Sequence, residues 1–68
     1  MSPAQLFAKK DADMWLESAV KSTMEPRDLL ERNWLQLLLV ERYQRQFGGT
    51  KLEALRKVAD AFALHFPH

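Results

Sequence analysis

The sequence predicts an all-α fold: three helices in an antiparallel arrangement that pairs into a helical homodimer. Apolar residues recur at steps of three and four along the chain, and no segment alternates as a strand would. The glycines and prolines are Pro3, Pro26, Gly48, Gly49 and Pro67. They divide the 68 residues into three helix-length segments with short joints. We therefore expect one helical domain over residues 1–68, with helices over about 3–23, 26–47 and 50–66.

The first segment begins with helix-capping residues and carries a face of mostly small residues. Ser2 can cap the helix, and Pro3 suits its first position. The apolar positions at helical spacing are Ala8, Ala12, Trp15, Leu16, Ala19 and Val20. Phe7 and Met14 fall on a different side, so we expect them to form a second apolar strip that another helix or another chain covers.

The second helix is expected to begin at Pro26, because proline disfavours helical geometry at the residue before it. Ser22 or Thr23 is then the expected N-cap. Arg42 and Arg45 stand near the other end, where the negative pole of the helix dipole favours cations.

The middle of this second helix is apolar on nearly all sides for two turns, whereas a helix in a monomeric bundle needs only one apolar stripe. The side expected to face the other helices holds Leu30, Trp34, Leu37 and Val40, and the other side holds Leu35, Leu38 and Leu39. Leaving the last three in water would forgo roughly 5–9 kcal/mol, at about 1.5–3 kcal/mol each. A twofold copy of the same surface is the simplest cover.

An alternative arrangement needs no partner. If the second helix lies centrally, with the first and third helices on two of its sides, all three of these leucines are inside the monomer.

The third helix carries the clearest local markers. Gly48 is a natural left-handed cap for the helix before it. Thr50 and Glu53 form the Thr-x-x-Glu pattern of a capping box. The expected core stripe is Leu52, Leu55, Ala59, Phe62, Ala63 and Phe66, with Val58 at its edge.

Charge gives a second interpretation of the same region. The net charge is +1, which gives no overall field favouring nucleic acid. A local basic patch is nevertheless present, formed by Arg42, Arg45, Lys51, Arg56 and Lys57. It suggests a small nucleic-acid-binding protein of helix-turn-helix type as an alternative function. Glu53 and Asp60 stand between these basic residues on the third helix and weigh against phosphate contacts.

Groups that carry catalysis or bind metals are missing from the sequence. There is no cysteine, so disulfides and thiolate metal sites are excluded. The serines lie far in sequence from His65 and His68, and Gly48-Gly49 lacks the longer phosphate-loop pattern. Pro67 separates the two histidines, which we interpret as a chain end rather than as zinc or nickel ligands. We expect no enzymatic activity, no cofactor and no metal.

We therefore expect a small protein–protein interaction or regulatory module that acts through helical surfaces and forms a homodimer. The expected interface residues are Leu35, Leu38, Leu39, Phe7 and Met14. A further alternative is an accessory subunit whose partner covers the second helix. The longest apolar run is far shorter than a membrane span, and the N-terminal segment does not resemble a signal peptide, so we expect a cytoplasmic protein without a membrane contact.

Overall fold

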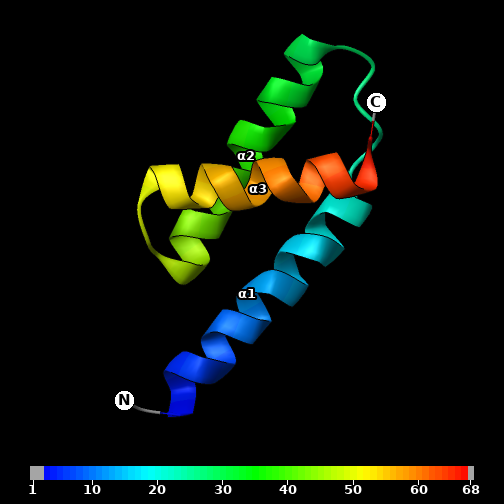
Figure 1. Cartoon of the computed structure of the whole chain (residues 1–68). Coiled ribbons are helices and arrows are strands. Elements are labelled where there is room, and N and C mark those ends of the chain that lie inside the picture. Colours follow the sequence, from blue (N-terminus) through cyan, green and yellow to red (C-terminus); the bar gives the residue numbers. More distant parts are fainter. Residues whose placement is uncertain (1–2, 68) are drawn as a thin grey trace.

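The computed structural model describes the backbone of residues 3–67 and the side chains of residues 11–67. It contains the helices α1 (Pro3–Lys21), α2 (Leu29–Phe47) and α3 (Lys51–His65), and no strand occurs within the described backbone (Figure 1). The predicted all-α class and the three helices are confirmed. None of the helices described here is both long and apolar enough to cross a membrane.

α2 begins three residues later than the sequence predicts. The Asp28 side chain is its N-cap and accepts a hydrogen bond of 2.8 Å from the Glu31 backbone N–H. The Glu31 carboxylate in turn accepts a bond from the backbone N–H of Arg27 and pairs with its guanidinium at 3.1 Å. The expectation that Pro26 opens the helix is wrong, because the Asp28 side chain satisfies a free N–H group of the first turn, at Glu31, and helical hydrogen bonding begins after Asp28.

The proposed caps Ser22 and Thr23 belong to the helix before. The Ser22 hydroxyl donates to the carbonyl of Ser18 at 2.9 Å, and the Thr23 hydroxyl donates to the carbonyl of Val20 at 2.7 Å. Both hydroxyls therefore help to terminate α1 instead of starting α2, and Pro26 lies buried in the connection that follows.

The connection between α2 and α3 follows the prediction closely. Gly48 and Gly49 both have positive φ, of 77° and 89°. The Gly48 N–H closes α2 by donating to the carbonyl of Gln44 at 2.8 Å. Gly48 has ψ of −156°, so it adopts a region with positive φ that essentially only glycine occupies, rather than the left-handed helical region that was predicted. Thr50 caps α3 by accepting from the Glu53 N–H at 3.1 Å, as predicted.

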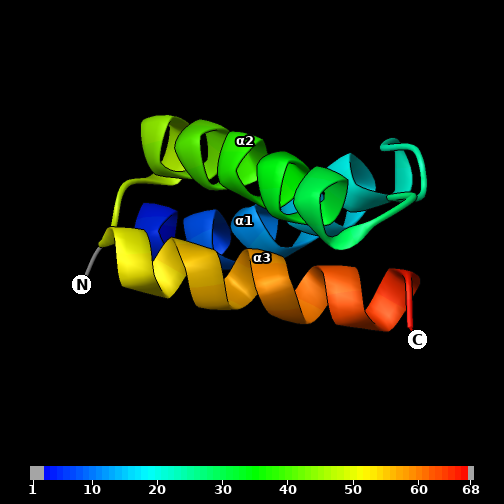
Figure 2. The same cartoon turned by 90° about the horizontal axis from the view of Figure 1, so that it is seen from above.

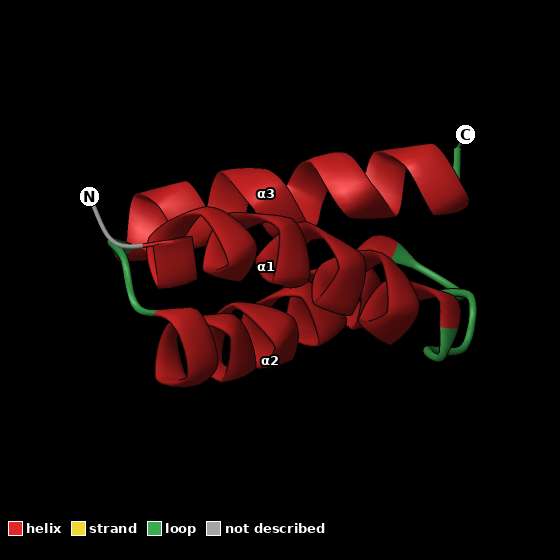
Figure 3. Ribbon diagram, turned by 90° about the horizontal axis from the view of Figure 1, so that it is seen from below, coloured by secondary structure: helices red, strands yellow, loops and turns green. Residues whose placement is uncertain are grey.

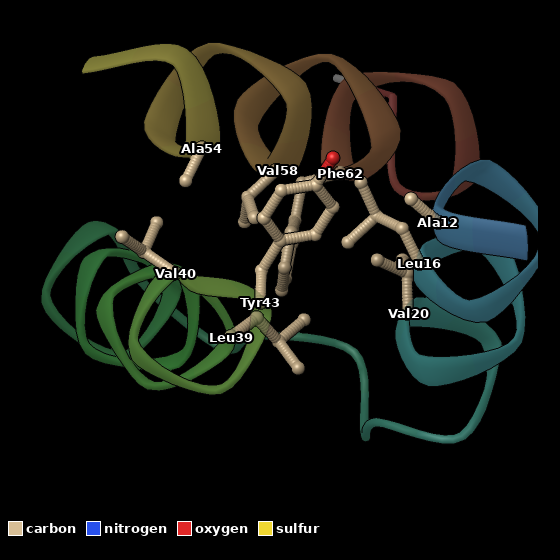
Figure 4. Packing of buried hydrophobic residues seen from close by; sticks show 9 residues of the cluster. All are labelled: Ala12, Leu16, Val20, Leu39, Val40, Tyr43, Ala54, Val58 and Phe62. Carbon is tan, nitrogen blue, oxygen red and sulfur yellow. The ribbon is translucent and has the colours of Figure 1, made fainter. Parts of the chain in front are cut away.

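The three helices surround one apolar core, with each helix at a corner of a triangle (Figure 4). Each pair of helices is in contact, and the contact between α2 and α3 is the most extensive. The buried residues are Ala12, Leu16 and Val20 of α1, Leu39, Val40 and Tyr43 of α2, and Ala54, Val58 and Phe62 of α3. The rings of Trp15, Tyr43 and Phe47 pack together beside this core, with centroids 5.3–6.2 Å apart.

The core-facing sides of α2 and α3 differ from the predicted ones. On α2 the buried side is centred on Leu39 and Tyr43, not on Trp34. On α3 Val58, which was expected at the edge of the stripe, is fully buried together with Ala54 and Phe62, whereas Leu52 is exposed. Both helices are therefore rotated about their axes relative to the expectation, so that residues expected in the core, such as Trp34 and Leu52, lie on the outer surface.

Candidate interaction surfaces

The outer side of α2 carries an exposed apolar stripe, formed by Leu30, Trp34 and Leu37. Their exposed fractions are 79%, 59% and 43%. The spacing of four and three residues places them on one side of the helix. At 100° per residue, Trp34 lies about 180° around the helix from the buried Tyr43. The stripe therefore points directly away from the core.

Within the described residues, no other helix covers this stripe. In Figure 2 and Figure 3, which show the molecule from opposite sides, α2 forms one outer layer with α1 and α3 both on its inner side. The stripe is thus an unpartnered apolar helix face rather than part of the core.

Charged pairs border the stripe at both of its ends. Before Leu30, the Arg27 guanidinium pairs with Glu31. After Leu37, Arg45 pairs with Glu41 at 3.0 Å across one helical turn. The apolar surface is therefore short, and a solvent-exposed ion pair lies near each of its ends. In the first pair the arginine precedes the glutamate along the chain, and in the second pair the glutamate precedes the arginine.

Two of the three predicted interface leucines of α2 lie in the core or against it. Leu39 is 4% exposed and belongs to the core, and Leu35 is half-buried and packs against that core. Leu38 is half-buried. The assignment of Leu39 to a free surface is therefore corrected, because the outward side of α2 is the one that holds Trp34.

Of the two predicted interface residues of the first helix, the structure describes the side chain of one. Met14 lies on the outside of α1 with 66% of its surface exposed, which is compatible with the predicted apolar strip. Phe7 lies in α1, and its side chain falls outside the described residues. Contact of either residue with another chain stays a prediction.

The five residues of the predicted basic patch do not act as one group of free cations. Arg45 is engaged by Glu41, and the Lys57 ammonium lies 3.6 Å from an Asp13 carboxylate oxygen on α1. The other three members, Arg42, Lys51 and Arg56, are exposed on α2 and α3. Two of the five positive charges are thus already compensated within the chain.

A shallow groove of about 530 Å³ runs between α1 and α3. Its lining residues are Asp13, Leu16, Glu17, Lys57, Asp60, Ala61, Leu64 and His65. The hydrogen bond and ion pair with Lys21 lower the pKa of Glu17, and the charge of His65 adds a smaller contribution in the same direction. No cysteine or serine lines the groove, and the described residues contain no cluster of three or more metal-binding side chains.

Lys57 lies on α3 and contacts both of the other helices. Its ammonium pairs with Asp13 of α1 and lies 5.9 Å from the centroid of the Tyr43 ring on α2. Partial burial disfavours the charged form, but Tyr43 and Asp13 outweigh this effect and raise the pKa of Lys57. Lys57 therefore makes a charged contact that links the three helices.

Sequence reasoning missed the stripe because it assigned Trp34 to the core. The pattern of α2 offers apolar residues on both sides, and periodicity alone does not choose between them. One observation would have helped: the stripe runs directly into Glu41 and Arg45 along the same helix side, whereas the opposite side continues with the apolar ring of Tyr43.

No family model, curated protein or solved structure matches this chain.

Proposed function

We propose that this protein is a non-enzymatic interaction module that forms a homodimer, with the outer stripe of α2 as the contact surface. The observation that carries the proposal is the exposure of Leu30, Trp34 and Leu37 on the side of α2 opposite the core. Full burial of a side chain of this size contributes about 1.5–3 kcal/mol. Because the three side chains are partly exposed, covering the stripe would contribute about 3–5 kcal/mol for each copy, which is a large fraction of the stability of a small domain.

The composition of the stripe also supports a protein partner. A central tryptophan flanked by leucines and rimmed by charged residues is typical of a contact between proteins, in which aromatic residues dominate the binding energy. We propose a second copy of the chain as the partner, because a twofold contact needs only one self-complementary patch, which both chains carry.

Several finer expectations from the sequence belong to this proposal. They are the antiparallel arrangement of the three helices, a regulatory role and a cytoplasmic location. An accessory subunit of a larger assembly would use the same stripe for a different chain. Nucleic-acid binding has less support, because Arg45 and Lys57 of the basic patch pair with Glu41 and Asp13.

The test compares two leucines of equal exposure on different helices. Leu30 and Leu64 are each 79% exposed, but Leu30 belongs to the stripe and Leu64 lies on α3. We expect the wild type and Leu64→Gln to be dimers by light scattering at high micromolar concentration, and Leu30→Gln to be a folded monomer.

Two results would contradict the proposal. One is a wild type that stays monomeric at high micromolar concentration. The other is an equal loss of association in Leu30→Gln and Leu64→Gln, which would indicate that the contact does not depend on the stripe.

A further inference from the structure

We propose that the groove between α1 and α3 binds a short amphipathic helix of another protein, one that carries lysine or arginine beside its apolar stripe. This inference goes beyond the homodimer, because it assigns a second binding surface to a different part of the molecule. It follows from the apolar residues of the groove, from the carboxylates on both of its walls and from its length.

The groove has an apolar lining that a partner can cover. Leu16 of α1 and Ala61 of α3 line it, and they are buried and half-buried. Leu64 of α3 lines the same groove and is 79% exposed. An exposed leucine that continues an apolar lining gains free energy when a second apolar side chain removes it from water.

Carboxylates stand on both walls of the groove. Asp13 and Glu17 are four residues apart and therefore share one side of α1, and Asp60 stands on α3. The cationic residues of the described lining are Lys57 and, when it is protonated, His65. With a neutral histidine, three negative charges face one positive charge, so the groove favours a cationic partner.

The ion pairs within the chain leave these carboxylates available. Glu17 pairs with Lys21 at 3.0 Å, but both side chains are more than half exposed, and such a pair contributes little to stability. Asp60 takes part in no ion pair among the described side chains. A cation of the partner can therefore pair with Asp60 or replace Lys21 at Glu17, while Lys57 keeps its contact with Asp13.

The shape of the groove fits a helix of about two turns. On α3 its lining extends from Lys57 to His65, which is about 12 Å along the helix axis. A hollow between two packed helices receives the apolar side of a further helix, as in other helix-in-groove contacts. A nucleic acid does not fit the same surface, because its phosphates would meet the three carboxylates.

The groove and the α2 stripe are separate surfaces. The described lining residues of the groove all belong to α1 or α3. Both of these helices lie on the inner side of α2 in Figures 2 and 3, whereas the stripe points outward. A second copy seated on the stripe therefore leaves the groove open.

A titration with a defined peptide tests the inference. The probe is an amidated peptide of leucine, lysine and alanine, about 14 residues long, with its leucines at helical spacing on one side. The control peptide has glutamate in place of every lysine. In amide NMR spectra of the full chain, we expect the lysine peptide to shift the signals of Ala61 and Leu64 in a saturable way and the glutamate peptide to leave them in place.

Matched substitutions locate the contact. We expect Leu64→Gln to raise the dissociation constant of the lysine peptide about tenfold, because the partner loses an apolar contact. Leu52→Gln is the control, since Leu52 is 65% exposed on the same helix and is not among the lining residues.

A second pair of variants tests the charge. Asp60→Asn should raise the same dissociation constant about threefold at low salt, and added salt should reduce the difference. Glu25→Gln, an exposed carboxylate in the connection between α1 and α2, should have no effect.

The outcomes separate this inference from the homodimer. Saturable binding of the lysine peptide that depends on Leu64 and Asp60 supports it. Equal binding of both peptides, no saturable binding, or binding that is lost in Leu30→Gln and kept in Leu64→Gln overturns it. Light scattering of the same variants without peptide tests the homodimer, so either proposal can fail while the other stands.

Discussion

At the scale of single residues, Lys57 shows how a half-exposed side chain connects the helices. Its ammonium reaches Asp13 of α1 and the Tyr43 ring of α2 from a position on α3. No buried polar or charged residue is found among the described side chains. Contacts between helices beyond apolar packing therefore come from half-exposed groups such as this one.

We expect Lys57→Met to lower the free energy of unfolding by about 0.5–1 kcal/mol at neutral pH, because the ion pair and the ring contact are both partly exposed to solvent. Since the pKa of Lys57 is raised in the folded state, the stabilisation is fully present below the ordinary lysine pKa of about 10.4. It is lost as the pH rises through the folded-state value. Urea unfolding of both proteins at fixed protein concentration, between pH 7 and pH 11, measures the difference.

The neighbouring Arg56 provides the control for this prediction. It is exposed on α3, so Arg56→Met should leave stability nearly unchanged. A Lys57→Met variant whose stability differs from the wild type by the same amount at every pH would contradict the assignment.

At the scale of helices, the sequence alone predicts the features that depend on a few adjacent residues. The Gly48-Gly49 joint and the Thr50 cap are local, because a positive φ and a free N–H group each require a particular residue at one position. The start of α2 was predicted wrongly for a related reason. Pro26 limits the backbone conformation of the residue before it, but this does not fix the residue at which helical hydrogen bonding begins. That residue is set by Asp28, whose side chain caps the first turn.

The orientation of a helix about its axis is harder to predict. α2 has leucines on both sides, so either side can satisfy the periodicity of a core helix. The side that becomes buried depends on the side chains that α1 and α3 place against α2, Val20 and Phe62 among them. It is therefore determined by the packing of all three helices and not by the sequence of α2 alone. The missed position of Trp34 is a direct consequence.

The cap of α2 gives a prediction at this scale. Asp28→Ala removes the acceptor for the Glu31 N–H, and we expect it to lower the free energy of unfolding by about 1 kcal/mol. Ser22→Ala should have a much smaller effect, since the Ser22 hydroxyl donates to a carbonyl at the exposed end of α1. Chemical denaturation followed by circular dichroism measures both. A larger loss in Ser22→Ala than in Asp28→Ala would place the start of α2 nearer to Pro26.

At the scale of the whole molecule, the surface is larger than a folded monomer of this size requires. The accessible surface is 5339 Å², whereas the usual relation between mass and area gives about 4,400 Å². The radius of gyration is 12.3 Å, compared with about 11 Å for a typical domain of this length. The first turns of the α1 backbone extend past α2 and α3 in Figure 1.

This excess is similar in size to the area that a stable protein contact covers. A standard interface buries about 800 Å² on each partner. The α2 stripe contributes to such an area, and the exposed Met14 on α1 adds apolar surface elsewhere. A second copy would thus reduce the exposed surface toward that of an ordinary folded protein.

The fluorescence of Trp34 reports whether a second copy covers the stripe, because this side chain lies in its middle. Trp15→Phe leaves Trp34 as the only tryptophan and keeps an aromatic ring beside Tyr43 and Phe47. We predict that the emission of this variant is blue-shifted at high concentration and moves to longer wavelength on dilution, with unchanged helicity, as the dimer dissociates and exposes the indole. An emission maximum typical of a solvent-exposed indole at every concentration would contradict the account.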